Sequence, residues 1–165
     1  MSAAVVDTNV LIVANGKNTH ATGECQLACI RRLRVLREHG IVVLDEQDLI
    51  FDEYKNQHLK FSGQPGVGDA FFRHLHEKKH DAAKVELVTL TPIGNGNAQF
   101  REFPANRRLA RFDRSDRKFV AAAKASVNNP KILNATDSDW EEFQTALQAN
   151  GVIVDQLCPE HAKKQ

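Results

Sequence analysis

The stretch AVVDTNVLI, residues 4–12, decides the fold of this chain, because a short apolar run leads directly into an acid. A β-branched run that is buried on both faces is typical of a strand in a parallel sheet. In an open α/β sheet, ligands bind just beyond the carboxyl ends of such strands, and Asp7 falls there. A carboxylate in an apolar setting needs hydrogen bonds, a cation or a proton. The stretch therefore predicts a functional acid at a sheet edge, with a divalent cation as its favoured partner.

Short Val, Ile and Leu runs alternate with helical periodicity along the rest of the chain. Strands are expected near residues 5–6, 41–44, 85–90, 132–133 and 152–154. Helices are expected at about 20–39, 46–60, 66–80, 115–127 and 138–149. This alternation predicts an α/β fold with three α/β/α layers around a central five-stranded parallel sheet. The length fits a single domain over residues 1–165.

Charge and cysteine content set broad limits on the function. The chain has 22 Lys and Arg against 21 Asp and Glu, so its net charge does not indicate a polyanionic partner. Cys25, Cys29 and Cys158 are an odd number without a C-x-x-C pair, which predicts buried free thiols in a reducing compartment. No apolar run approaches the roughly 20 residues that span a bilayer. We expect a cytoplasmic protein with no membrane partner.

The first helix should bury one stripe of its surface. Its expected core positions, spaced three residues apart, are Leu27, Ile30, Leu33 and Leu36. The segment 91–111, which contains two prolines and two glycines, is expected to be a long surface connection.

Acids recur after the expected strands. In the acidic run after the second strand, Glu53 lies close to the apolar side of the helix, whereas Asp45 and Glu46 suit the helix N-terminus. Ser115 is a candidate cap that places Asp116 in the first turn of the next helix. Asp137 follows the fourth strand.

Two further features belong to the segment after the fourth strand. Asp139 is an additional candidate acid, two residues beyond Asp137. Ser138 and Glu141 fit a capping box at the start of the last helix.

The strands that end at Asp7 and Asp137 are expected to be neighbours, about 4.8 Å apart. Two such carboxylates repel each other unless a proton or a cation separates them. Oxygen ligands favour Mg²⁺ or Mn²⁺ over zinc, and one or two such ions suit hydrolysis of a phosphodiester. The alternative for any single acid is a helix cap or a solvated charge.

Four segments together resemble the PIN domain family of metal-dependent nucleases: residues 5–11, 51–54, 113–123 and 134–139. The resemblance covers nearly the whole chain and implies the strand order 3-2-1-4-5. It also implies metal-dependent endoribonuclease activity on RNA, with single strands as the expected substrate. Many members of this family are held by an inhibitory protein, which leaves such a partner open. A homodimer is also open, because the site is shallow in small domains of this kind. The region 55–111 departs from minimal members because it is longer and richer in glycine.

The resemblance also implies roles for particular residues. Asn9 becomes a polar organiser of the site. The metal-binding acids would be Asp7, Glu53, Asp116 and Asp137, with Asp139 as a further candidate.

A basic stretch leads into the expected metal site. Residues 101–118 hold seven Lys and Arg against three acids, which predicts attraction of phosphates toward the site. An ordinary solvated surface is the alternative. Phe100, Phe103 and Phe112 lie among these bases and suit either stacking on bases or anchoring of the loop. The expected substrate-binding bases are Arg107, Arg108, Arg111 and Arg114.

Three competing functions are weighed against the nuclease. His76-Glu77-Lys78-Lys79-His80 fits the H-E-x-x-H zinc pattern, but its two lysines and the lack of a third ligand on the same helical face disfavour a metalloprotease. A phosphatase of the haloacid dehalogenase type also places an Asp nucleophile after its first strand, yet Asn9 replaces the second acid of its D-x-D pattern. The third alternative is a non-catalytic module that binds nucleic acid or protein.

Overall fold

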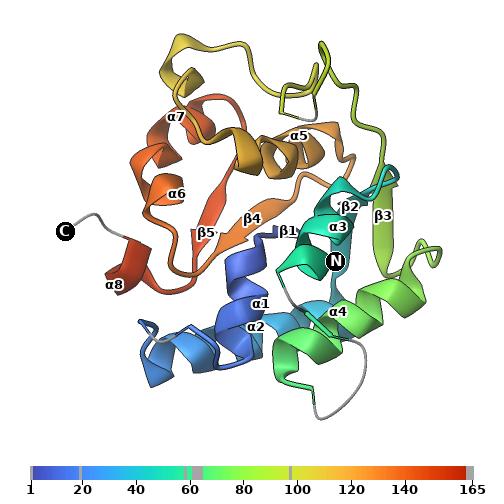
Figure 1. Ribbon diagram of the computed structural model, residues 1–165, viewed down its shortest axis with the longest axis vertical. Coiled ribbons are helices and arrows are strands. Elements are labelled where there is room, and N and C mark those ends of the chain that lie inside the picture. Colours follow the sequence, from blue (N-terminus) through green and yellow to red (C-terminus); the bar gives the residue numbers. More distant parts are fainter. Residues whose placement is uncertain (1, 19, 58, 61–64, 97, 163–165) are drawn as a thin grey trace.

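A single parallel sheet organises the chain. The computed structural model describes residues 2–18, 20–57, 59–60, 65–96 and 98–162, so residue 1 and residues 163–165 of the expected domain lie outside it. Within the described residues, the strand order is β3-β2-β1-β4-β5, with every pairing parallel (Figure 1). The predicted five-stranded sheet and its order are confirmed. The strands are β1 Ala3–Val6, β2 Ile41–Asp45, β3 Val85–Val88, β4 Lys131–Asn134 and β5 Val154–Gln156.

Helices lie on both sides of the sheet, which gives the three predicted layers. In Figure 1, α1, α2 and α4 lie on one side and α5, α6 and α7 on the other. The helices are α1 Thr8–Ala14, α2 Gly23–His39, α3 Leu49–Asn56, α4 Val67–Lys78, α5 Arg117–Ala125, α6 Ser138–Glu142, α7 Gln144–Ala149 and α8 Pro159–Ala162, with short 3₁₀ turns η1 Arg107–Leu109 and η2 Arg114–Asp116.

Helix α1 was not expected from the sequence. Its apolar run VLIV, residues 10–13, is rich in the β-branched residues that favour strands. The Asp7 carboxylate nevertheless accepts the backbone N–H of Asn9 at 2.9 Å, which caps the helix and turns the chain out of β1. Burial of Val10 and Leu11 against the rest of the core then outweighs the local preference.

The buried stripe of α2 differs from the predicted one. Leu33 and Leu36 are buried as expected, and Ile30 is partly buried, but Leu27 is 49% exposed. Cys25 and Cys29 are the buried side chains in the first half of the helix.

The expectation of buried free thiols is wrong for two of the three cysteines. Cys25 and Cys158 form a disulfide across 133 residues of sequence, whereas Cys29 is free. Burial raises the pKa of the Cys29 thiol to about 12. The cysteines therefore no longer indicate a reducing compartment.

The segment 91–111 is anchored by its own apolar side chains. Pro92 and Phe100 form an antiparallel bridge, and Phe100 and Leu109 are almost completely buried. Phe112, directly after the segment, packs edge-on against Trp140 with a centroid distance of 5.1 Å. The anchoring role of the buried Phe100 and Phe112 leaves them unable to stack on nucleic-acid bases.

Several predicted boundaries and caps are corrected. The expected helix 138–149 is two helices separated at Phe143, and β5 begins two residues later than predicted. Asp137 rather than Ser138 caps α6, since its Oδ1 accepts the N–H of Asp139 at 2.9 Å. Ser115 is not a cap either.

The turn before α5 shows why Ser115 has another role. Its N–H and hydroxyl both donate to Asp113 Oδ1, at 2.8 and 2.9 Å. The first turn is therefore the 3₁₀ turn η2, and Asp116 stands at the start of α5.

In the described part of the chain, no helix combines the length and the apolar character that crossing a lipid bilayer requires.

Candidate functional site

Asp7 lies at the carboxyl end of β1 with both carboxylate oxygens engaged. Oδ1 accepts the side-chain amide of Asn9 at 2.7 Å in addition to the Asn9 backbone N–H. Oδ2 accepts the indole N–H of Trp140 at 2.8 Å. The side chain is only 5% exposed, and these bonds hold its orientation.

Asn9 ties β1 to the end of β4. Its Nδ2 donates to Asn134 Oδ1 at 2.9 Å, and its Oδ1 accepts the N–H of Ala135 at 2.8 Å. Asn134 donates in turn to the backbone carbonyl of Asp137 at 2.9 Å. A continuous polar network therefore fixes the two strand ends that carry Asp7 and Asp137. The role of Asn9 in organising a functional site stays a prediction.

Three of the predicted acids meet at this edge of the sheet. Carboxylate oxygens of Asp7, Asp116 and Asp137 all lie within 4.8 Å of one another. They come from the end of β1, from the start of α5 and from the turn after β4, which are far apart in sequence. Among the described residues, no Lys, Arg or His forms an ion pair with any of the three.

The electrostatics of the cluster favour a cation or protons. Burial raises the pKa of Asp7 to about 7 and that of Asp116 to about 9. The negative charge of Asp137 contributes to both raised pKa values, and that of Asp7 also raises the pKa of Asp116. Burial also raises the pKa of Asp137. The metal-free cluster therefore retains protons at pH values where ordinary carboxyl groups are ionised. Three oxygen donors at this spacing fit the ligand preference of Mg²⁺ or Mn²⁺.

Glu53 lies beside the three-acid cluster and has other partners. Its carboxylate pairs with Lys118 Nζ at 2.6 Å and accepts the hydroxyl of Thr8. Glu53 contributes to the raised pKa values of Asp7 and Asp116. The structure therefore places this predicted ligand next to the cluster, held by Lys118. The acid predicted for the helix N-terminus, Asp45, accepts the first amides of α3 at 2.8 and 2.9 Å.

Asp139 is held at the rim of the site by its backbone. Its N–H donates to Asp137, and its charge adds to the raised pKa of Asp137. Asp139 is outside the group of carboxylates that the described residues bring within 4.8 Å.

The basic stretch divides into two parts. Arg117 donates to the carbonyl oxygens of Ala110 and Phe112 and lies over the Phe103 ring, so it stabilises the loop. Lys118 pairs with Glu53. The four predicted substrate-binding bases are all exposed, on η1, on η2 and between them: Arg107, Arg108, Arg111 and Arg114.

The H-E-x-x-H segment forms no metal group among the described residues. His76 lies on α4 and stacks on Phe51 with a centroid distance of 5.7 Å, whereas His80 follows the end of that helix. The metal-compatible groups in the described part of the chain are the three-acid cluster and a group of three cysteines.

Sequence reasoning did not find Trp140, Lys118, Thr8 or Asn134 as members of the site. Trp140 is the single tryptophan of the chain and lies three residues after Asp137, one helical turn away, which is a usable signal. The pairing of Lys118 with Glu53 joins α5 to α3, and no local pattern reveals it.

Compared with protein-family models, with curated proteins and with solved structures, the chain gives no match.

Proposed function

We propose that the protein is a metal-dependent endoribonuclease that hydrolyses phosphodiester bonds of single-stranded RNA. The observation that supports this most strongly is the convergence of three carboxylates at the carboxyl ends of the strands. Asp7 and Asp116 are buried and Asp137 is partly buried, and within the part of the chain that the structure describes none of them forms an ion pair with a base. An oxygen-only donor set of this kind fits one or two Mg²⁺ or Mn²⁺ ions. Asp7, Asp116 and Asp137 would hold the metal, which when bound would supply an activated water and stabilisation of the leaving oxygen.

The chain's own residues would prepare this chemistry. Trp140 and Asn9 hold the Asp7 carboxylate in one orientation through three hydrogen bonds. Preorganised ligands of this kind need no rearrangement when the reaction proceeds. Lys118 neutralises Glu53 at the edge of the cluster and limits the negative charge that an approaching phosphate meets.

The choice of substrate rests on two arguments. The exposed bases from Arg107 to Arg114 lead along the chain to Asp116 and would attract phosphates by charge. RNA in preference to DNA is proposed from the resemblance to PIN domains, as is an inhibitory protein partner. Cytoplasmic localisation and a homodimer stay predictions.

The second candidate is a non-catalytic module that uses the same face to bind nucleic acid. The observation in its favour is that Lys118 and Thr8 already occupy the Glu53 carboxylate. A phosphatase with Asp7 as nucleophile is less favoured, because Trp140 and Asn9 engage both of its oxygens.

The test is cleavage of labelled single-stranded RNA and DNA with Mg²⁺, Mn²⁺ or a chelator. We expect cleavage of RNA that the chelator abolishes and that Asp7→Asn and Asp116→Asn reduce at least about 100-fold. Asp52→Asn, an exposed acid on α3, is the matched control and should cleave like the native chain. Equal cleavage by all variants would reject the enzyme, and binding without cleavage would favour the module.

A further inference from the structure

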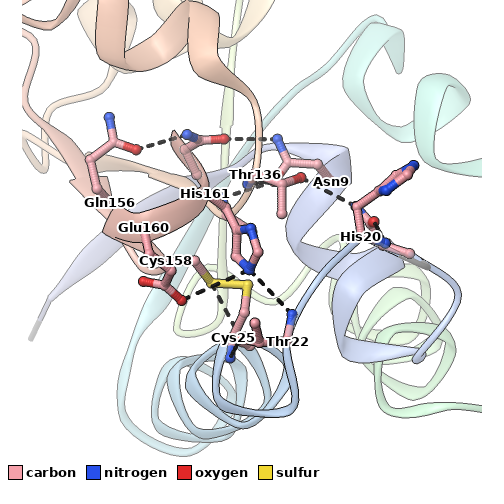
Figure 2. The surroundings of a disulfide bond; sticks show 12 residues. Asn9, His20, Thr22, Cys25, Thr136, Gln156, Cys158, Glu160 and His161 are labelled. Carbon is pink, nitrogen blue, oxygen red and sulfur yellow. Dashed lines mark hydrogen bonds and ion pairs between the residues drawn. A yellow bond between two sulfur atoms is a disulfide. The ribbon is translucent and has the colours of Figure 1, made fainter. Parts of the chain in front are cut away.

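A second donor cluster of different chemistry lies at the start of α2. The sulfur atoms of Cys25, Cys29 and Cys158 lie within 4.8 Å of one another, and all three side chains are buried. Cys25 and Cys29 are one turn apart on α2, and Cys158 follows β5. Figure 2 shows Cys25 and Cys158 with the bond between them. Cys25 and Cys158 are joined as a disulfide, with a Cα–Cα distance of 5.2 Å. The third cysteine, Cys29, takes no part in that bond.

A histidine lies near the Cys25–Cys158 disulfide. His161, on α8, lies next to the disulfide in Figure 2, and its Nε2 accepts the backbone N–H of Thr22 at 3.2 Å. Thr22 caps α2 by accepting the N–H of Cys25 at 3.1 Å. The His161 imidazole therefore lies at the start of α2, as Cys25 does. Its Nε2 lone pair points toward this end of the helix.

The spacing of these residues is typical of a structural zinc site. Cys25-x₃-Cys29 is within the range of the first ligand pair of such sites, and Cys158-x₂-His161 supplies the second pair. A Cys₃His donor set is one of the usual structural sets. Zn–S bonds of about 2.3 Å in a tetrahedron place sulfurs about 3.8 Å apart, which is inside the spread seen here. This arrangement requires two changes: the disulfide opens, and His161, whose nitrogens lie outside the group of ligand atoms within 4.8 Å of one another, moves from Thr22 toward the sulfurs.

We propose that the reduced chain binds one zinc ion through Cys25, Cys29, Cys158 and His161, and that the disulfide is the oxidised alternative of this site. A dithiol reductant transfers two electrons and two protons to the Cys25–Cys158 bond and becomes a disulfide itself. Zinc binding then releases the three thiol protons. His161 Nε2 leaves the Thr22 N–H and binds the metal with its lone pair. A water molecule then accepts the Thr22 N–H, which is exposed.

This site is independent of the three-acid cluster. Sulfur and imidazole ligands select zinc, whereas the carboxylate oxygens of Asp7, Asp116 and Asp137 select Mg²⁺ or Mn²⁺. Either form of the cysteine site connects the start of α2 to the segment after β5. Zinc would therefore maintain in the reduced chain the connection that the disulfide makes in the oxidised chain.

The test is titration of the full chain with Co²⁺ after reduction by a phosphine. We expect the thiolate-to-metal charge-transfer band and the visible band of a tetrahedral ion to saturate at one thiolate-bound Co²⁺ per chain, apart from any Co²⁺ at the carboxylates, and both bands to be abolished by added Zn²⁺. Co²⁺ at carboxylates alone gives no thiolate band, so Asp7→Asn should leave these bands unchanged. A folded, reduced chain without a thiolate band would overturn the proposal.

Variants separate zinc binding from the disulfide. Cys29→Ser keeps both disulfide partners, and we expect it to weaken metal binding at least about 100-fold. His161→Ala should weaken binding and shift the visible band, whereas His20→Ala is the control, because the His20 ring is turned away from the sulfurs in Figure 2. Unchanged affinity in Cys29→Ser overturns the site, and unchanged spectra in His161→Ala overturn the fourth ligand. Native mass spectrometry of the reduced chain adds a second readout: we expect one zinc ion in the wild-type chain that Cys29→Ser loses and Asp7→Asn keeps.

Discussion

Asp7 serves the fold and the proposed chemistry with the same two oxygens. Oδ1 caps α1 through the Asn9 N–H, and Oδ2 accepts the Trp140 indole N–H. Both bonds stabilise the ionised form, yet burial and the neighbouring acids raise the pKa of Asp7 more strongly. The carboxylate is therefore held in place for a cation but is poorly stabilised without one.

The pH dependence of stability follows from these raised pKa values. A carboxyl group with a raised pKa holds its proton more tightly in the folded chain than in the unfolded chain. Without a divalent ion, the free energy of unfolding should fall as the pH rises from about 4 through the raised pKa values of Asp7 and Asp116. Asp116→Asn should flatten this fall and stabilise the metal-free chain at pH 8 by about 1 to 3 kcal/mol.

Urea unfolding in a chelator over this pH range measures the effect. Asp52→Asn, which changes an exposed acid, should follow the native chain. A free energy of unfolding that rises with pH over the same range would contradict the assignment of the raised pKa values.

At the scale of elements, the contact between α1 and α4 depends on a glycine. A Cβ at Gly68 would overlap the backbone carbonyl of Leu11, and it would lie 2.9 Å from Asn15 Oδ1. Asn15 Oδ1 also accepts the N–H of Asp69 at 2.9 Å, so α1 supplies a cap for the start of α4. Close approach at Gly68 therefore keeps α1, which begins at Asp7, in its position.

We expect Gly68→Ala to destabilise the chain by about 3 kcal/mol, because backbone atoms on both helices must move. Gly23→Ala is the matched control, because Gly23 also lies in the first turn of a helix and a Cβ there meets nothing within 4 Å. It should be neutral or slightly stabilising. Chemical denaturation measures both, and equal stability of the two variants would contradict the packing described for α1 and α4.

Sequence patterns predicted the strands well and the turns between them less well. The apolar runs of β1, β2 and β4 are unambiguous, and parallel pairing follows from the helices between them. Helix α1 was missed because its β-branched residues favour a strand locally. The Cys25–Cys158 bond was missed because its partners are 133 residues apart, and no spacing in the sequence brings them together.

In the candidate site, too, the sequence predicted which strand ends meet but not which side chains pair between helices. The ends of β1 and β4 were predicted to be neighbours, and the structure brings Asp7 and Asp137 together there with Asp116. The ion pair of Glu53 with Lys118 could not be predicted, because it depends on how α3 and α5 face each other.

At the scale of the whole molecule, charge is nearly balanced but unevenly placed. The exposed bases from Arg107 to Arg114 lie on η1, on η2 and in the segment between them, and η2 ends at Asp116. Lys131, by contrast, is the first residue of β4, at the amino end of the strand. The acids of the cluster lie at the carboxyl ends of the strands. An approaching polyanion would therefore meet positive charge next to the three-acid cluster.

The double variant Arg107→Glu/Arg108→Glu should weaken binding of single-stranded RNA more at low salt than at high salt. Each lost phosphate contact should reduce the slope of log K against log salt by about 0.7. Fluorescence anisotropy in a chelator measures binding without cleavage. The control is Lys78→Glu/Lys131→Glu, an equal charge change at exposed positions outside the basic stretch. A loss that is independent of salt, or equal in both double variants, would contradict attraction by these arginines.

Calorimetric titration with Mn²⁺ at several pH values tests the three-acid cluster most directly. Because Asp7 and Asp116 have raised pKa values, metal binding should expel protons, and the affinity should rise with pH. Asp7→Asn and Asp116→Asn should abolish binding, while Glu53→Gln should weaken it less, because Lys118 holds Glu53. The account predicts this order with proton release. It would be contradicted by a native chain that binds no Mn²⁺, or by Mn²⁺ binding that Asp7→Asn and Asp116→Asn leave unchanged.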